Sequence, residues 1–130
     1  MTDRELVRLA LSMRDRAYAP YSGFTVGAAL LCADGSVFTG CNVENGAYGS
    51  TLCAERVALV KAVSEGHRND LSCLAVAGGE NECWPCGACR QMLAEFAPRL
   101  RVLVGRGDGD WTETTLDALL PHAFGAKSME

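Results

Sequence analysis

Helical and strand-like patterns alternate along the whole chain, and their order leaves few architectures open. A helix is predicted from Thr2, which can form a capping box with Glu5, and its apolar positions recur at helical spacing until Pro20. An apolar run over 25–32, an Asp-Gly turn and a second run over 37–41 predict an antiparallel hairpin. The chain therefore opens with one helix and two paired strands.

The next patterns are helical and strand-like in turn. Helices are predicted from position 51 or 52 to Gly66 and from position 86 or 87 to Pro98, with a buried strand over 71–77 between them. The residues of these helices expected to face the core are Ala54, Val57, Ala58, Ala62, Ala88, Met92, Leu93 and Phe96.

The last patterns complete one sheet. Residues 101–105 predict another strand, residues 111–115 a weaker edge strand, and residues 116–121 a short helix. We therefore expect an α/β fold over residues 1–130 as a single domain: a three-layer α/β/α sandwich with one mixed five-stranded sheet.

Composition narrows the class of protein. Hydrophobic residues make up 48% of the chain and charged residues 22%, no apolar run approaches the roughly 20 residues of a membrane helix, and no secretory signal is visible. A cytoplasmic location follows, where the 7 cysteines would stay reduced and would serve metal or redox chemistry. The net charge of -4, without a cluster of Lys and Arg, argues against nucleic-acid and membrane partners.

Two predicted helices begin with cysteine. Cys53 starts "CAERVAL", and Cys86 and Cys89 form a C-x-x-C pair in "PCGACRQML". A helix N-terminus stabilises thiolate, which zinc prefers as a ligand. Three thiolates would leave the fourth position of a tetrahedral zinc open, which is typical of a catalytic site.

Glu55 lies two residues after Cys53, where its carboxylate can reach a metal-bound water without being a ligand. Zinc lowers the pKa of bound water from about 15.7 to about 7, so a hydroxide would be available to attack and Glu55 could move its protons. The alternative is a favourable charge at the positive end of a helix dipole. Arg56 and Arg90 are either solvated or donate to the thiolates and so offset their excess negative charge.

Whether Cys83 binds the metal distinguishes a catalytic zinc site from a structural one. As a fourth thiolate it would close the zinc and exclude water. Pro85 biases Trp84 away from helical geometry, so we expect Cys83 in an extended loop outside the ligand set. The other cysteines, Cys32, Cys41 and Cys73, are predicted to be small core residues, and His67 and His122 to be surface or loop residues.

"CAE" followed by "PCGAC" resembles the signature of zinc-dependent nucleoside and nucleobase deaminases. The blocks "YAPYSGFTVGAALL", "GCNVENGAYGS" and "LLPHAF" are further similar to the small homotetrameric cytidine deaminases. The resemblance implies one zinc per chain on Cys53, Cys86 and Cys89. It also implies hydrolytic deamination of cytidine and 2'-deoxycytidine to uridine and 2'-deoxyuridine, with Glu55 as the proton shuttle.

The same resemblance assigns the substrate contacts. Asn42 and Glu44 would bind the ribose hydroxyls, Phe24 would pack on the pyrimidine, and Ala54 would offer backbone groups to the base. In a homotetramer with shared active sites, Ala47, Tyr48 and Phe124 would approach the nucleoside of a neighbour. A redox protein, a four-cysteine structural module, a nucleic-acid-editing deaminase and a blasticidin deaminase are the alternatives.

Overall fold

The computed structural model describes residues 1–129, which form one mixed five-stranded sheet of order β2-β1-β3-β4-β5. The strands are β1 (Gly27–Cys32), β2 (Val37–Cys41), β3 (Leu71–Ala77), β4 (Arg101–Gly107) and β5 (Asp110–Thr115). Only β3 and β4 are parallel among the neighbouring pairs of this sheet. The predicted hairpin, mixed sheet and β5 edge strand are confirmed.

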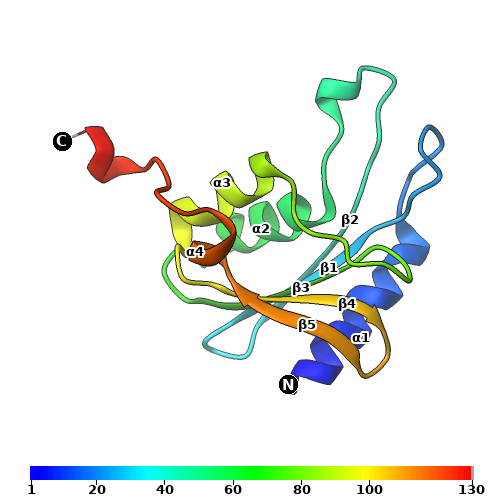
Figure 1. Cartoon of the computed structure of the whole chain (residues 1–130), viewed down its shortest axis with the longest axis horizontal. Helices are drawn as coiled ribbons and strands as arrows, with labels where there is room; N and C mark the ends of the chain where they lie inside the picture. Colours follow the sequence, from blue (N-terminus) through cyan, green and yellow to red (C-terminus); the bar gives the residue numbers. More distant parts are fainter. Residues whose placement is uncertain (130) are drawn as a thin grey trace.

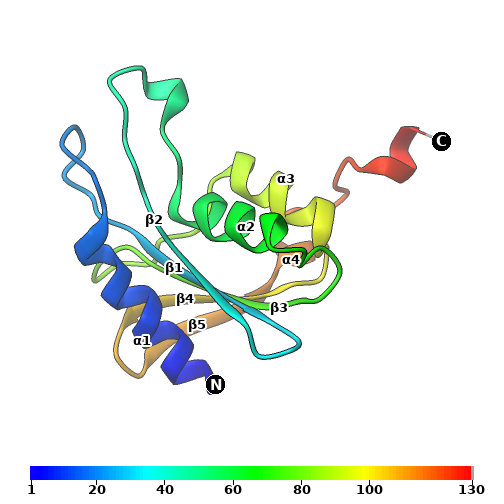
Figure 2. The same ribbon diagram turned by 180° about the vertical axis from the view of Figure 1, so that it is seen from behind.

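Helices cover both faces of the sheet, as Figures 1 and 2 show from opposite sides. One face carries α1 (Asp3–Met13), and the other carries α2 (Ala54–Ser64), α3 (Gly87–Phe96) and the short α4 (Leu116–Leu119). Alternate residues of β3 point to opposite sides, so Ala75 packs in the α1 core and Leu74 in the α2/α3 core. The three-layer α/β/α sandwich is confirmed.

Two glycines let the helices approach the sheet closely. A Cβ at Gly27 would lie 1.9 Å from the Ala10 carbonyl oxygen of α1, and one at Gly40 would lie 2.2 Å from the Ala54 carbonyl oxygen of α2. Only a residue without a side chain fits at either contact. Gly40 thereby fixes where the first turn of α2 sits on the sheet.

Two helix boundaries differ from the predictions, and in both cases the chain leaves the helix to pair elsewhere. The first helix ends at Met13 and a short 3-10 turn follows, because the Tyr18 N–H then donates to the Asn42 carbonyl at 2.9 Å. The second begins at Ala54 rather than at 51 or 52, because Leu52 pairs with Val43 through two 2.9 Å backbone hydrogen bonds.

Several expected core positions are also corrected. Ala88 is exposed, because α3 buries only the stripe of Cys89 and Leu93 and Ala88 lies one residue away from it. Val57 is half-buried, as is Cys41, whose thiol faces a backbone carbonyl of the 3-10 turn. Cys32 and Cys73 are both buried core residues, as predicted.

Several connecting and terminal segments project from the layered body (Figure 1). The connection between β2 and α2 extends beyond the sheet, and the C-terminal tail after α4 leads away from it on another side (Figure 1). Within residues 1–129, no helix has the length and apolarity needed to cross a membrane.

Candidate active site

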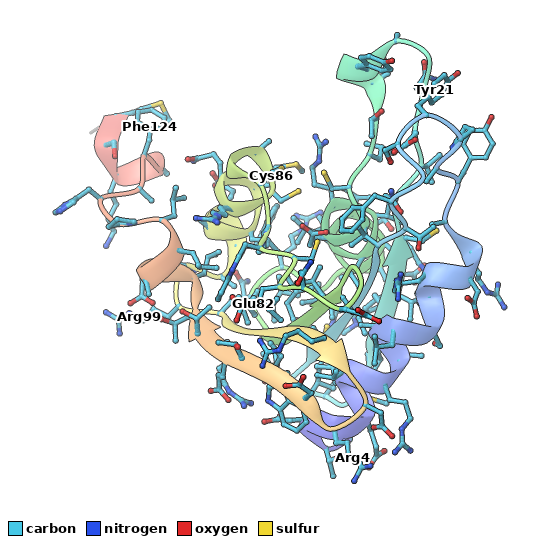
Figure 3. The ribbon with its side chains drawn as sticks, turned by 45° about the vertical axis from the view of Figure 1, so that its right-hand side comes forward. Arg4, Tyr21, Glu82, Cys86, Arg99 and Phe124 are labelled. Carbon is cyan, nitrogen blue, oxygen red and sulfur yellow. The ribbon has the colours of Figure 1, made fainter. Side chains whose placement is uncertain are left out.

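The starts of α2 and α3 carry the three cysteines of the predicted centre. Cys53 is the N-cap of α2 and Cys86 the N-cap of α3, both in extended conformation, and neither side chain makes a capping hydrogen bond. Cys89 follows in the first turn of α3 and is buried. Figure 3 labels Cys86 at the start of its helix. Two helix N-termini thus bring their free N–H groups and three thiols together.

The sulfur separations fit a shared metal rather than a disulfide. Cys53 Sγ lies 3.8 Å from Cys86 Sγ, and Cys86 Sγ lies 3.4 Å from Cys89 Sγ. A disulfide needs about 2.05 Å, and all three cysteines are free. Two sulfurs bound to one tetrahedral zinc at about 2.3 Å lie about 3.8 Å apart. The donor set therefore fits zinc with three protein ligands.

Electrostatics favour thiolate at Cys53. A hydrogen bond from the Cys89 thiol, together with the Arg56 guanidinium, lowers the pKa of Cys53 to about 5, while sharing that proton raises the pKa of Cys89. Arg56 Nη2 lies 3.9 Å from Cys53 Sγ and donates to the Thr51 carbonyl at 3.0 Å. Arg56 thus takes the charge-offsetting position predicted from the sequence.

Arg90 does not share that role. Its Nε donates to the Pro85 carbonyl at 2.7 Å and its Nη1 to the Leu119 carbonyl at 2.8 Å. The guanidinium is occupied by the backbone on either side of α3, so the prediction that it could donate to sulfur is wrong. Its contacts instead hold the segment that leads into Cys86.

Glu55 lies in the first turn of α2 and is 4% exposed. Burial, with a further contribution from the charge of Cys53, raises the pKa of Glu55 to about 7. A carboxyl group that titrates near neutral pH can both accept and return a proton.

A cavity of about 240 Å³ opens beside this carboxyl group and the thiols. It is lined by Ser22, Phe24, Val26, Asn42, Glu44, Thr51, Cys53, Ala54, Glu55, Cys83, Trp84 and Cys86. Four of the residues assigned by resemblance to the nucleoside, Phe24, Asn42, Glu44 and Ala54, therefore meet at one cavity.

Cys83 lies in the cavity wall but outside the group of close metal donors, which within residues 1–129 contains Cys53, Cys86 and Cys89. A Cβ at Gly78 would lie 2.8 Å from Cys83 Sγ and 2.8 Å from the Phe24 ring, so these two side chains cover Gly78 together. Burial raises the pKa of Cys83 to about 11, which keeps it a neutral thiol at neutral pH.

Asn42 and Glu44 already hold the loop that carries Phe24. The Asn42 side chain accepts from the Val26 N–H at 2.8 Å and donates to the Phe24 carbonyl at 2.9 Å. Glu44 Oε1 accepts from the N–H groups of Tyr21 and Ser22, each at 3.0 Å. These hydrogen bonds fix one wall of the cavity.

Ser22 is a residue of the site that sequence reasoning missed. Its hydroxyl donates to Glu44 Oε2 and accepts from the Phe24 N–H at 3.0 Å, so it joins the carboxylate to the aromatic ring. No pattern within the sequence marks it, because its partner Glu44 is distant along the chain. Trp84 was likewise considered only for its backbone, yet it lines the cavity.

Three residues assigned by resemblance lie away from the cavity of their own chain. Ala47 is exposed, and Tyr48, which is 76% exposed, lines a neighbouring cavity of about 310 Å³ with Tyr21 and Glu44. Phe124 is 60% exposed on the C-terminal tail, and Figure 3 shows it and Tyr21 on opposite sides of Cys86.

Comparison with known proteins places this geometry in a family. Residues 1–105, which include all three thiols and Glu55, match the family described as the cytidine and deoxycytidylate deaminase zinc-binding region. This chain belongs to that deaminase family. Zinc is therefore the metal for which the Cys53, Cys86 and Cys89 set is built.

Relatives of this deaminase match it over nearly their full length. It is 50% identical to a cytidine deaminase of Halalkalibacterium halodurans over 129 residues, which are 98% of either chain. A cytidine deaminase of Sporosarcina psychrophila is 46% identical over 99% of this chain and 96% of that one. A crystal structure of cytidine deaminase from Burkholderia pseudomallei superposes with a TM-score of 0.91 at 47% identity, over 95% of this chain and 100% of the other. Such similarity makes this deaminase a hydrolytic enzyme with the fold of its relatives.

Proposed function

We propose that this enzyme hydrolyses cytidine and 2'-deoxycytidine to uridine and 2'-deoxyuridine and releases ammonia. The observation that carries the proposal is Glu55, a buried carboxyl group beside three thiols at zinc spacing, which lines one cavity together with Cys53 and Cys86. A redox pair needs neither the third thiol nor the carboxyl group. A structural zinc module needs no cavity next to its metal.

The reaction replaces the C4–N bond of the base with a C4–O bond. Zinc, when bound, lowers the pKa of a water molecule and so supplies a nucleophile at neutral pH. Glu55 accepts the proton that this water loses and delivers protons to N3 of cytosine and to the departing amine. The C4–O bond forms and the C4–N bond breaks, so nucleoside and water become the uridine product and ammonia.

The remaining cavity residues orient the nucleoside. Phe24 packs on the pyrimidine ring, Ala54 offers its backbone groups to the base, and Arg56 offsets the charge of the three thiolates. The Asn42 amide can donate to and accept from the ribose hydroxyls, and the Glu44 carboxylate accepts from them. Both side chains are already held by backbone contacts, so little further ordering is needed on binding.

We further propose a homotetramer in which Ala47, Tyr48 and Phe124 complete the cavities of neighbouring chains. Large apolar side chains are exposed on the projecting segments, with Tyr48 at 76% and Phe124 at 60%, and burial between subunits would remove them from water. A cavity closed by neighbours would admit a free nucleoside and exclude a polynucleotide. The cytoplasm is the location that would keep the 7 free cysteines reduced.

The direct test measures zinc content and turnover on the same purified preparation. We expect one catalytic zinc per chain and a loss of ultraviolet absorbance when either nucleoside is added. Zinc-replete protein that turns over neither cytidine nor 2'-deoxycytidine would contradict the proposed activity.

A Cys83→Ser variant separates the enzyme from a four-thiol module. Because Cys83 lies outside the close donor group, the variant should keep its catalytic zinc and substantial turnover. Loss of that zinc in Cys83→Ser, at unchanged circular dichroism, would place Cys83 among the ligands and reject the open site.

A further inference from the structure

A second group of metal-binding side chains lies at the opposite end of the sheet. Cys32 ends β1, and His67 and Asp70 lie in the connection between α2 and β3. A backbone hydrogen bond of 2.8 Å from the Ala33 N–H to the Asp70 carbonyl joins these two segments. Five residues of β1 at about 3.4 Å each separate this end from Gly27, so the group lies about 17 Å from the cavity end of the strand.

The backbone positions these side chains in defined ways. Cys32 lies opposite Leu71 at the end of the β1–β3 pairing, where the register shifts and Ser72 of β3 is left without a partner in β1. Gly66, at φ +95°, ends the turn after α2, and the His67 N–H then donates to the Ala62 carbonyl at 3.0 Å. Cys32 is therefore held by strand pairing, and His67 by the backbone hydrogen bond that follows the end of α2.

The donor atoms converge as they do in the catalytic centre. Within residues 1–129, two groups of three His, Cys, Asp or Glu residues bring their ligand atoms within 4.8 Å of one another: the three catalytic thiols, and Cys32 with His67 and Asp70. Cys32, like Cys89, is buried. A buried thiol whose sulfur lies within 4.8 Å of an imidazole nitrogen and a carboxylate oxygen has the chemistry of a zinc ligand.

Two carboxylates bracket the imidazole of His67. Its Nδ1 lies 2.8 Å from Asp70 Oδ2, so the imidazole and the carboxylate that would share the ion already lie side by side. Its Nε2 lies 3.9 Å from Asp34 Oδ2, too far for a hydrogen bond, so Asp34 adds negative charge beside the group. Asp34 Oδ1 accepts from the Ser36 N–H at 2.8 Å, which leaves Oδ2 free to face the ring.

The local charge is negative. Asp70, Asp34 and Glu65 all act to raise the pKa of His67, and Asp70 and Asp34, after burial, raise the pKa of Cys32 to about 11. A divalent cation would offset these carboxylates and displace the thiol proton.

We propose that Cys32, His67 and Asp70, with Asp34 beside them, form a second divalent-metal site of the zinc class. It lies too far from the cavity to act in hydrolysis. Its effect is structural, because one ion would join the end of β1, the hairpin turn and the α2–β3 connection. Binding to the folded chain alone would raise its stability in proportion to metal occupancy.

Cobalt(II) is the probe that tests the site. The catalytic centre is first filled with zinc, which binds more tightly than cobalt in the usual order of affinities. Cobalt chloride is then added, excess ion is removed by gel filtration, and both metals are counted. We expect one zinc and one cobalt per chain, thiolate-to-cobalt charge-transfer absorption, and a melting temperature higher than that of the zinc-only protein.

The variants identify the donors. Cys32→Ser should abolish the charge-transfer absorption, and both His67→Gln and Asp70→Asn should weaken cobalt binding at least tenfold. Cys41→Ser, the control that removes a more accessible thiol, should leave cobalt binding unchanged. His67→Gln and Asp70→Asn alter partly exposed side chains, so they test the site even if Cys32→Ser folds poorly.

Two results would overturn the proposal. One is wild-type protein that holds one zinc per chain and takes up no cobalt beyond it. The other is cobalt absorption that survives Cys32→Ser or disappears in Cys41→Ser. Because the readouts are metal count, absorption and stability, the outcome does not depend on which nucleoside the enzyme hydrolyses.

Discussion

At the scale of single residues, a substitution of Glu55 can test proton transfer without disturbing metal binding. Its carboxyl group lies in the cavity, and its neighbours Cys53 and Arg56 serve the thiolate set instead. Glu55→Gln keeps the shape of the side chain but cannot carry a proton. We expect unchanged zinc content and a fall in kcat of about 10²–10⁴-fold, the usual contribution of a positioned acid–base group.

The matched control for that variant is Glu95→Gln, which makes the same change at an exposed position of α3. It should retain wild-type kcat and zinc. If Glu55→Gln also kept wild-type turnover, the proton-shuttle role would be wrong while the metal assignment stood.

Ser22 is expected to affect binding more than chemistry. Ser22→Ala removes the hydroxyl that joins Glu44 to the Phe24 N–H. The residue proposed to bind the ribose is then no longer connected to the residue proposed to pack on the base. Two lost hydrogen bonds at about 1 kcal/mol each predict a rise in KM of about 5- to 30-fold with a smaller change in kcat. Steady-state kinetics measure this split, and Ser22→Thr, which retains the hydroxyl, should restore most of the loss. A variant with unaltered KM would show that Ser22 does not position these groups.

The sequence could predict the cluster of three thiols because all three lie at two helix starts. It could not reveal Ser22 or the true role of Arg90, because their partners are a side chain and backbone carbonyls brought close only by folding.

At the scale of elements, the sequence correctly predicted caps and turns, which depend on neighbouring residues. It did not predict helix boundaries that depend on pairing between distant segments. Thr2 does cap α1, with its side chain accepting from the Glu5 N–H, and Gly35 does adopt the positive φ of the hairpin turn. The early end of α1 and the late start of α2 both follow from bridges formed with Val43 or its neighbours. Periodicity carries no information about such bridges.

The contact between β2 and α2 gives a prediction that joins stability to activity. Gly40→Ala would place a Cβ 2.2 Å from the Ala54 carbonyl oxygen and 2.7 Å from the Ala58 nitrogen, which are backbone atoms that can move only with the helix. Overpacking of this kind typically costs about 1–3 kcal/mol. We expect a lower midpoint of chemical denaturation and, because α2 carries Glu55, reduced kcat in the folded fraction.

Gly27→Ala and Gly107→Ala are the controls. Gly27 meets α1 on the opposite face, so its substitution should lower stability without the same effect on kcat. A Cβ at Gly107 would meet nothing within 4 Å, so that variant should resemble the wild type in both measurements. Equal kcat in Gly40→Ala and wild type would mean that α2 can shift without moving the site.

At the scale of the whole molecule, the proposed tetramer gives the tail and the projecting loop a role. Phe124 is proposed to act in a neighbour's cavity, so Phe124→Ala should raise KM while the chain stays folded. Mixed assemblies make the test specific. Phe124→Ala chains co-assembled with inactive Glu55→Gln chains should regain sites with wild-type KM, because the Glu55→Gln chains supply the missing ring.

Light scattering supplies the accompanying measurement of mass. A tetramer is expected for the wild type and for both variants. A monomer, or mixed assemblies that show no recovery of KM, would contradict a shared active site.

The capping residues of α2 and α3 bear on how resistant the protein is to proteolysis in a cell. Both helices begin on a cysteine whose side chain makes no capping hydrogen bond, so the bound metal is what would tie the two starts together. Newly made chains that fail to obtain zinc should therefore be open to proteases at these first turns. Under zinc starvation we expect the amount of this enzyme to fall, with no reserve of intact, metal-free protein waiting to be reactivated.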